Sequence, residues 1–254
     1  MIIRNLVKFP QYESFFILGP RQTGKSTLVR SRLQKKKYFE INLLEDSLLR
    51  KYAQDPDLLI KEVEFQIEEE KVKHIFIDEI QKIPALLNPI QSMIDRHNVQ
   101  FILSGSSARK LIGMHGNLLG GRAIMINLFP LTYLELEQKF NFERFLQLGN
   151  IAGMFSHTAE IAAQKLQAYV QSYLKEEIAQ EGIVRKLLPF SRFLELAGHT
   201  TSQILNFENI ARESGIPAKT VASYYQILQD TFMGYFLPAW DLSIRKQLSK
   251  HSKF

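Results

Sequence analysis

Nine consecutive residues near the amino terminus have the types and the spacing that hold a chain of phosphates. They read Gly19-Pro20-Arg21-Gln22-Thr23-Gly24-Lys25-Ser26-Thr27 and fit the pattern G-x-x-x-x-G-K-[ST], the P-loop. The two glycines let the backbone turn tightly with its N–H groups pointing inward. We expect Lys25 to reach the β- and γ-phosphates, Ser26 to coordinate Mg²⁺, and Thr27 to begin the packing of the next helix.

The segments on both sides of this loop favour a P-loop over a chance glycine-rich turn. Residues 14–18 are apolar, as in a strand buried on both faces of a parallel sheet. Residues 25–33 can form a helix, whose positive dipole end adds to the attraction for phosphate. Strand, loop and helix together are the context that this motif requires.

A second apolar run ends in two carboxylates. Residues 75–77 precede Asp78 and Glu79, which is the arrangement a nucleotide hydrolase needs opposite its phosphate loop. Asp78 is predicted to hold Mg²⁺, directly or through water, and Glu79 to polarise the water that attacks the γ-phosphate. The alternative is that both carboxylates only cap the turn after the strand.

Strands and helices alternate through the first half of the chain. The apolar runs predict strands at residues 14–18, 38–42, 74–79, 99–104 and 122–128. The spacing of apolar residues predicts helices at 25–33, 57–70 and 84–97. Such alternation predicts an α/β fold of the P-loop NTPase type, a parallel sheet with helices on both faces.

Past residue 130 the sequence becomes helical. Helices are expected at 132–139, 142–149, 159–179, 190–197, 206–213 and 218–230, with a Ser-Gly-Ile-Pro turn before the last and a strand at 231–237 after it. This outline predicts a winged helix-turn-helix. The expected domains are an ATPase core at 1–150, a helical linker or lid at 151–186, the winged helix at 187–240 and a basic tail at 241–254.

Composition limits the class of protein and its partners. The 254 residues are 45% hydrophobic and contain no apolar run of the roughly 18 residues that span a bilayer, so we expect a cytoplasmic protein without a membrane segment. The absence of cysteine excludes disulfides and thiolate metal sites, and the six histidines lack ligand spacing. Mg²⁺ with the nucleotide is therefore the one metal expected. A net charge of +6 permits nucleic acid as a partner without requiring it.

Four segments together resemble the prokaryotic AAA-type (AAA+) P-loop ATP-binding proteins that carry a carboxy-terminal region of unknown function. They are GPRQTGKST, HIFIDEIQKIP, FILSGSSARKL and GGRAIMINLFPL. The resemblance spans nearly the whole chain and implies ATP as the nucleotide. It implies a core whose fourth strand inserts between the P-loop strand and the strand that ends at Asp78. In such proteins Arg4 would flank the nucleotide.

The resemblance also implies two further catalytic residues. Ser104 ends the fourth strand, where this class keeps a polar residue that senses the γ-phosphate; a simple turn residue is the alternative. Arg122 matches an arginine finger, with Arg109 as a weaker candidate. Whether Arg122 serves its own site, serves a neighbouring subunit in a homo-oligomer, or forms a structural ion pair stays open.

The helix-turn-helix predicts a second type of partner. Lys219, Thr220, Ser223 and Tyr224 are expected to face a groove of duplex DNA, the alternative being a winged helix that packs as a lid over the nucleotide. Proteins of the similar family continue past the position of Phe254 into a further, nuclease-like domain, so the chain is expected to end early.

The predicted activity is Mg²⁺-dependent hydrolysis of ATP to ADP and phosphate, coupled to movement of the winged helix. Two alternatives remain. One is a nucleotide-gated switch that binds ATP without hydrolysing it. The other is a regulator that acts by binding DNA, where nucleotide only adjusts that binding.

Overall fold

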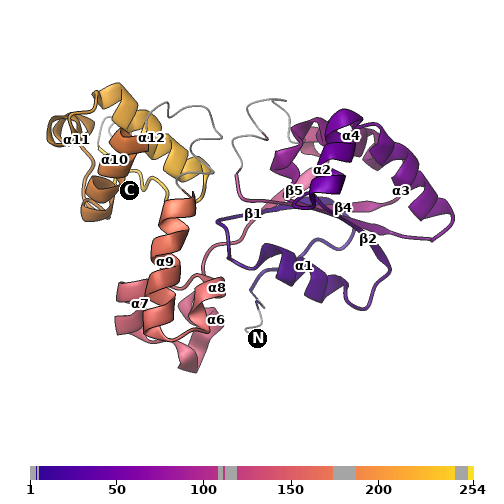
Figure 1. Cartoon of the computed structure of the whole chain (residues 1–254), viewed down its shortest axis with the longest axis horizontal. Coiled ribbons are helices and arrows are strands. Elements are labelled where there is room, and N and C mark those ends of the chain that lie inside the picture. Colours follow the sequence, from indigo (N-terminus) through magenta and orange to yellow (C-terminus); the bar gives the residue numbers. More distant parts are fainter. Residues whose placement is uncertain (1–3, 5, 108–110, 112–118, 174–186, 244–250) are drawn as a thin grey trace. The chain divides into compact units, whose positions relative to one another are not determined.

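The computed structural model describes residues 4, 6–107, 111, 119–173, 187–243 and 251–254 (Figure 1). The chain divides into two compact units, Met1–Ala163 and Gln164–Phe254. Each unit has its own core and is described by itself. Within the described residues, no helix is both long and apolar enough to cross a lipid bilayer.

A parallel sheet forms the centre of the first unit (Figure 1). Its strands are β1 (Ser14–Leu18), β2 (Tyr38–Asn42), β3 (His74–Asp78), β4 (Gln100–Gly105) and β5 (Ala123–Asn127). The strand order is β2-β3-β4-β1-β5, and every neighbouring pair is parallel. Because β4 lies between β1 and β3, the predicted insertion of the fourth strand is confirmed.

Helices cover both faces of this sheet, with α1 on one face and α2, α3 and α4 on the other (Figure 1). Their bounds are α1 Lys25–Leu33, α2 Asp46–Gln54, α3 Leu58–Glu68 and α4 Leu87–Arg96. All residues of β1 are buried, as its continuous apolar sequence predicts. Phe15 and Ile17 point to the α1 face, where they pack with Leu28 and Val29. The predicted α/β fold is therefore confirmed.

The sequence missed α2 and placed the start of α4 too early. The signal for α2 was present, because Leu48, Leu49 and Tyr52 stand at helical spacing, although the helix has only nine residues and buries only Tyr52. Ahead of α4 the chain forms two short 3-10 turns, Ile80–Lys82 and Pro84–Leu86. Proline at the first position of the second turn fits there because it needs no backbone donor.

Between the sheet and residue 173, the described residues form the α-helices α6 (Tyr133–Leu136), α7 (Phe142–Leu148), α8 (Ala152–Phe155) and α9 (Ala159–Tyr173). Thr132 and Glu135 cap the start of α6 by bonding to each other's backbone N–H groups. The Gly153 N–H in α8 donates to the Gln22 carbonyl of the phosphate loop at 2.9 Å. The unit that contains the sheet therefore extends to Ala163, past the predicted edge of the core at residue 150.

The second unit packs three helices around an aromatic cluster. They are α10 (Leu187–His199), α11 (Phe207–Ser214) and α12 (Ala218–Asp230). Gly215 ends α11 with a φ of 69°, which is the backbone conformation that glycine adopts most easily and that the predicted turn requires. Phe193 and Tyr225 are fully buried between the helices, with their rings 4.9 Å apart and perpendicular.

The predicted strand at 231–237 is wrong. The Thr231 hydroxyl bonds back to the Ile227 carbonyl at the end of α12, and Phe232 turns the chain with a φ of 62°. Among the described residues, Leu237 alone of this segment pairs, in a short antiparallel bridge with Lys253, which also bridges to Ile204.

The last residue of the chain lies in the aromatic cluster of the second unit. The Phe254 ring is 4.9 Å from that of Tyr225 and 5.2 Å from that of Phe236. The predicted basic tail at 241–254 therefore ends inside this unit.

Candidate nucleotide-binding site

The loop that follows β1 needs glycine at two positions for different reasons. At Gly19, a Cβ atom would lie 2.1 Å from the Leu128 carbonyl oxygen, so any side chain would collide with backbone. Gly24 has a φ of 89° and stands immediately before the first residue of α1. Both glycines of the P-loop pattern are thus required by the path of the backbone.

Lys25 lies inside the curve of this loop. Its Nζ donates to the carbonyl oxygens of Gly19 at 2.8 Å and Pro20 at 2.9 Å, and the side chain is buried. The buried Thr23 hydroxyl bonds to the same Pro20 carbonyl at 2.8 Å. The ammonium group therefore lies where a bound phosphate would meet it, beside the N-terminus of α1.

The carboxyl ends of the neighbouring strands β3 and β4 bring Asp78 and Ser104 together. Asp78 ends β3 and is only 3% exposed, and Ser104 is fully buried in β4. The Ser104 hydroxyl donates to Asp78 Oδ1. On its other oxygen, Asp78 lies 3.7 Å from the guanidinium of Arg30 on α1. A carboxylate with one oxygen anchored in this way is oriented for a second ligand.

Glu79 follows with an unusual backbone conformation. Its φ of 60° and ψ of 45° lie in the left-handed region, which costs a non-glycine residue about 1 kcal/mol or more. Its N–H donates to the Ser104 hydroxyl at 3.2 Å, so one serine contacts both acidic residues. The Glu79 carboxylate accepts hydrogen bonds from Ser106 at 3.3 Å and from Gln81. Neighbouring groups thus hold Glu79 in a strained position beside Asp78.

The arrangement fits Mg²⁺ with a polyphosphate. Ser26 is half-buried in the first turn of α1, and Asp78 ends a strand of the same sheet. Mg²⁺ takes few protein ligands, prefers hydroxyl and carboxylate oxygens, and completes its shell with water and phosphate. The described residues contain no cluster of three or more acidic, histidine or cysteine side chains, so they offer no metal cage of protein ligands alone.

Arg122 lies at the opposite end of the sheet. It immediately precedes β5, whose first residue pairs with Ser14 at the start of β1, whereas the phosphate loop follows Leu18. A strand of five residues spans about 16 Å, so Arg122 does not reach the loop of its own chain. Its Nε instead bonds to Asp95 at 2.6 Å. The structure does not bring Arg122 to the phosphate loop of its own chain, and a role in a neighbouring subunit stays a prediction. Arg109 lies outside the described residues.

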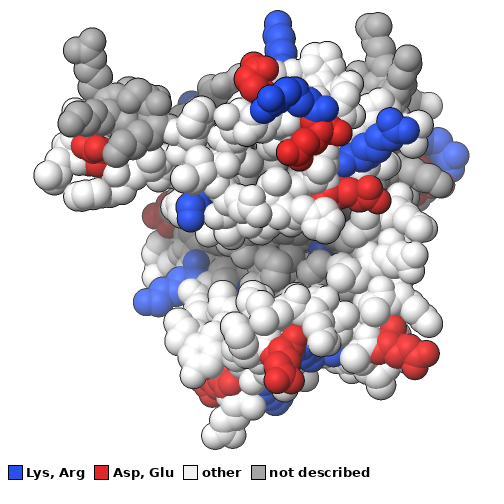
Figure 2. Space-filling view, turned by 90° about the vertical axis from the view of Figure 1, so that its left-hand side faces the viewer, with Lys and Arg blue, Asp and Glu red and all other residues white. Residues whose placement is uncertain are grey.

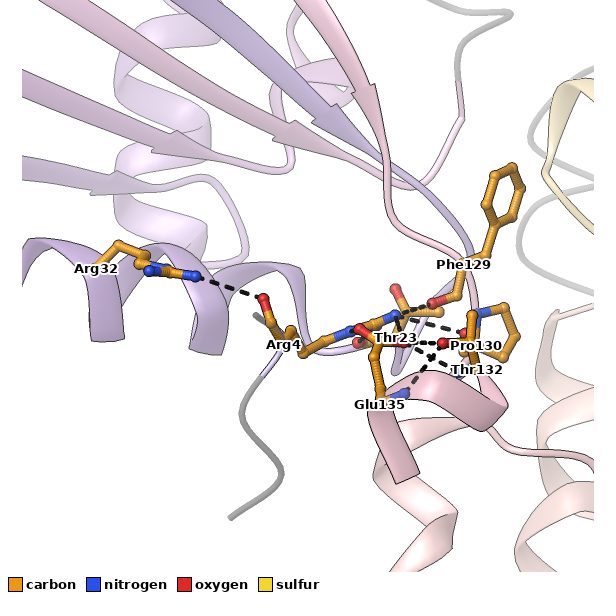
Figure 3. A network of polar contacts seen from close by, with 7 residues as sticks. All are labelled: Arg4, Thr23, Arg32, Phe129, Pro130, Thr132 and Glu135. Atoms are coloured by element: carbon orange, nitrogen blue, oxygen red, sulfur yellow. Dashed lines mark hydrogen bonds and ion pairs between the residues drawn. The ribbon is translucent and has the colours of Figure 1, made fainter. Parts of the chain in front are cut away.

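Arg4 hydrogen-bonds to the backbone of the phosphate loop (Figure 3). Its Nη1 donates to the Thr23 carbonyl at 3.0 Å, its Nη2 to the Phe129 carbonyl at 2.8 Å, and its Nε to Glu135 at 2.7 Å. Because all three nitrogens are engaged and the side chain is buried, Arg4 supports the loop backbone and does not flank the nucleotide as the resemblance implied.

The partner of Arg4 is an ionised, buried carboxylate. The Glu135 side chain is 2% exposed. Burial would raise its pKa, but hydrogen bonds from Arg4 and Thr132 outweigh it and hold the pKa of Glu135 below its ordinary value. Sequence reasoning could not pair these two residues, because 131 positions separate them.

Sequence reasoning also missed Gln81 and Ser106. Both are buried and both contact the Glu79 carboxylate. The run Asp78-Glu79-Ile80-Gln81 put Gln81 near the site, but the left-handed turn at Glu79 decides where its side chain points. That turn has no sequence signal, because it occurs at a residue other than glycine or asparagine.

The residues expected to face DNA divide into two groups. Lys219 and Ser223 are exposed on α12, and Thr220 is half-buried. Tyr224 is buried, with its ring 4.8 Å from that of Phe190, so the expectation that it faces a groove is wrong. On the face drawn in Figure 2, the described Lys and Arg side chains are interspersed with Asp and Glu. The described side chains drawn there form no single-sign patch of the kind that follows a phosphate backbone.

Comparisons with known proteins identify relatives that match nearly the whole chain. Among curated proteins, uncharacterized proteins of Mycobacterium tuberculosis and Mycobacterium bovis are each 25% identical over 240 residues, which cover 93% of this chain and 52% of theirs. An uncharacterized protein of Haemophilus influenzae is 22% identical, with 99% of this chain and 69% of that protein covered. The chain thus spans about half the length of the mycobacterial relatives.

Solved structures with a similar fold include an archaeal ATPase. The Walker-type ATPase of Pyrococcus abyssi matches with a TM-score of 0.60 at 16% identity, over 96% of this chain and 88% of that one. A family model described as a domain of unknown function matches residues 139–254. The model described as AAA domain matches residues 11–137, half of the chain, and the chain therefore belongs to the AAA domain family.

Proposed function

We propose that this chain binds Mg²⁺·ATP and hydrolyses it to ADP and phosphate. One observation carries the proposal: the phosphate loop, Asp78, Glu79 and Ser104 converge at the carboxyl ends of the three adjacent strands β1, β4 and β3. In open parallel sheets, ligands bind in the crevice outside this edge. The AAA domain family and the P-loop fold support a nucleotide as that ligand.

Each residue has a distinct part in the proposed reaction. The loop N–H groups and Lys25 hold the phosphates, while Ser26 and Asp78 hold the metal, which supplies positive charge to the phosphate oxygens when bound. Glu79 takes a proton from the attacking water as the bond between the β-γ bridging oxygen and the γ-phosphorus breaks. Ser104 orients both acids, because it bonds to the Asp78 carboxylate and to the Glu79 backbone.

Two contacts of the phosphate loop link it to helices α6 and α8 of the first unit, so they can respond when nucleotide binds. Gln22 accepts a hydrogen bond from Gly153 in α8, and the Thr23 carbonyl accepts one from Arg4, which in turn binds Glu135 in α6. A shift of the loop on nucleotide binding would change both contacts. In the proposed mechanism, α6 to α8 respond first and the helix-turn-helix, interpreted as part of a winged helix, moves in consequence.

Duplex DNA is not favoured as the main ligand. Lys219 is the one basic residue in the sequence of α12, and Tyr224 is committed to the core. A nucleotide-gated switch without hydrolysis uses the same loop and differs only in turnover. The two remaining functions are therefore separated by measuring phosphate release.

The test measures phosphate release from Mg²⁺·ATP by the unaltered chain, by Glu79→Gln and by Lys25→Ala, with binding of a fluorescent ATP analogue measured in parallel. Glu68→Gln is the matched control, since Glu68 is an exposed carboxylate at the end of α3. We expect Glu79→Gln to keep ATP binding and to lose about 10²- to 10⁴-fold in turnover. Lys25→Ala should lose binding, and Glu68→Gln should change neither. If the unaltered chain binds ATP but releases phosphate no faster than Glu79→Gln does, the protein is a nucleotide-gated switch instead.

A further inference from the structure

A buried glutamine contacts the carboxylate that we assign to the activation of water. Gln81 lies in the 3-10 turn Ile80–Lys82 and is 5% exposed. Its Nε2 donates to Glu79 Oε2 and, at 2.9 Å, to the hydroxyl of Ser106. The Ser106 hydroxyl donates to the same Glu79 oxygen at 3.3 Å. Two neutral donors thus converge on one oxygen of this carboxylate.

The orientation of the Gln81 amide is fixed by Glu79. The other end of the amide, Oε1, is buried and has no hydrogen-bond partner among the residues that the structure describes. Reversing the amide would turn this oxygen toward a carboxylate that only accepts hydrogen bonds, which would replace attraction by repulsion. Folded proteins generally avoid a buried oxygen without a partner, yet within the described residues Oε1 has none, and the amide N–H groups face Glu79.

A second buried glutamine shows what a purely structural role looks like. Gln100 begins β4 at the opposite end of the sheet and is 6% exposed. Its Nε2 donates to the carbonyls of Pro10 at 3.1 Å and Glu13 at 2.9 Å, and its Oε1 lies 2.9 Å from His74 Nδ1. Both ends of the Gln100 amide are thus bonded, whereas among the described residues only the Nε2 end of Gln81 is bonded, to Glu79 and to Ser106.

We infer that Gln81 is a positioning residue for hydrolysis, which fixes the Glu79 carboxylate in the direction of the attacking water. The inference rests on the proposed ATPase function. Gln81 donates to groups at the ends of β3 and β4, while the phosphates are assigned to the loop after β1. Its loss should therefore lower kcat and leave the affinity for ATP unchanged, because a misdirected base slows the chemical step alone.

The first experiment compares Gln81→Met with Gln100→Met. Methionine has nearly the length of glutamine but no N–H donor, and the two glutamines are matched in burial. We expect Gln81→Met to reduce kcat about tenfold or more, with the Kd for ATP unchanged. Gln100→Met should lower the melting temperature at least as much and keep the kcat of the unaltered chain.

A second variant moves the amide without changing its chemistry. A Cβ at Gly105 would lie 2.7 Å from Gln81 Oε1 and 3.1 Å from a methyl group of Leu18, so Gly105→Ala must displace the end of the Gln81 side chain. We expect Gly105→Ala to lower kcat as well. The double variant Gln81→Met/Gly105→Ala should be no slower than Gln81→Met, because both changes remove the same contact.

The outcomes separate the inference from the proposed function. No phosphate release by the unaltered chain would overturn both. Release by the unaltered chain with equal kcat for Gln81→Met would overturn the inference and leave the ATPase assignment standing. If Gln81→Met fails to fold, Gly105→Ala decides alone: an unchanged kcat overturns the inference, and a lowered kcat with unchanged ATP affinity supports it.

Discussion

The two ends of the same sheet each carry an arginine–carboxylate pair, and the two pairs differ in their exposure to solvent. At the loop end, Arg4 and Glu135 lie 2.7 Å apart with side chains 8% and 2% exposed. At the opposite end, Arg122 and Asp95 lie 2.6 Å apart with side chains 36% and 48% exposed. The two pairs thus have nearly the same distance but differ in their exposure to solvent.

The difference shows where the fold fixes its geometry. Burying a charge costs free energy unless the charge is paired and hydrogen-bonded. The buried Arg4–Glu135 pair is therefore held to one geometry, in which both side chains keep their hydrogen bonds. An exposed pair gains little, because water and salt screen it and its long side chains lose freedom. The fold buries its arginine–carboxylate pair at the end where the phosphate loop must be held and leaves the pair at the other end exposed.

The largest expected effect comes from breaking the buried pair. Arg4→Met leaves Glu135 buried without its partner and removes a donor from the Thr23 carbonyl. We expect the free energy of unfolding to fall by about 3 kcal/mol, as for other buried pairs that lose one member. Urea denaturation measures this, with Arg122→Met as the matched variant at the exposed pair. Equal losses in the two variants would refute the contrast between the two ends.

A smaller effect is expected on ATP turnover when Arg122 of the exposed pair is replaced. Because Arg122 lies about one strand length from the loop of its own chain, Arg122→Ala should keep the ATP affinity and the turnover per subunit in dilute protein. Phosphate release titrated over protein concentration tests this. A loss in turnover that grows with concentration would show that Arg122 acts in a neighbouring subunit, and a loss at the lowest concentration would contradict the geometry.

The smallest effect is a pH dependence at the amino end of β3. Burial lowers the pKa of His74, outweighing the hydrogen bond with Gln100, so the folded state binds a proton there less readily than the unfolded chain. Stability from the neutral ring is complete above about pH 6.5 and is lost as pH falls toward the lower folded pKa. In chemical denaturation between pH 7.5 and 5, the unaltered chain should lose more stability than His74→Gln. Parallel curves would show that His74 does not contribute.

The sequence predicted the parts of the site that are contiguous along the chain. The loop at 19–27, the strand ending at Asp78 and the strand bearing Ser104 all have local patterns of residue types. The contacts of Arg4 and Gln81 were not predicted, because the partner of Arg4 is remote in sequence and the direction of Gln81 depends on a left-handed turn at Glu79.

The errors have a shared physical cause, which is that tertiary contacts override local preference. The apolar and β-branched residues after α12 suit a strand, yet Thr231 bonds back to the helix and ends it. Tyr224 stands on the helix where a groove-facing residue was expected, yet its ring fills the cluster beside Phe190. Neither outcome follows from residue type alone.

The order of the strands has a consequence for how the chain folds. β2 and β3 are neighbours in sequence and in the sheet, whereas Phe15 in β1 pairs with Ile102 and Ile124, far along the chain. Closing such long loops costs entropy and is slow. During synthesis, the strand that carries the phosphate loop stays without partners until β4 has left the ribosome. The ability to bind nucleotide should therefore be among the last properties that the first unit acquires, and a nascent chain stopped before β4 should lack it.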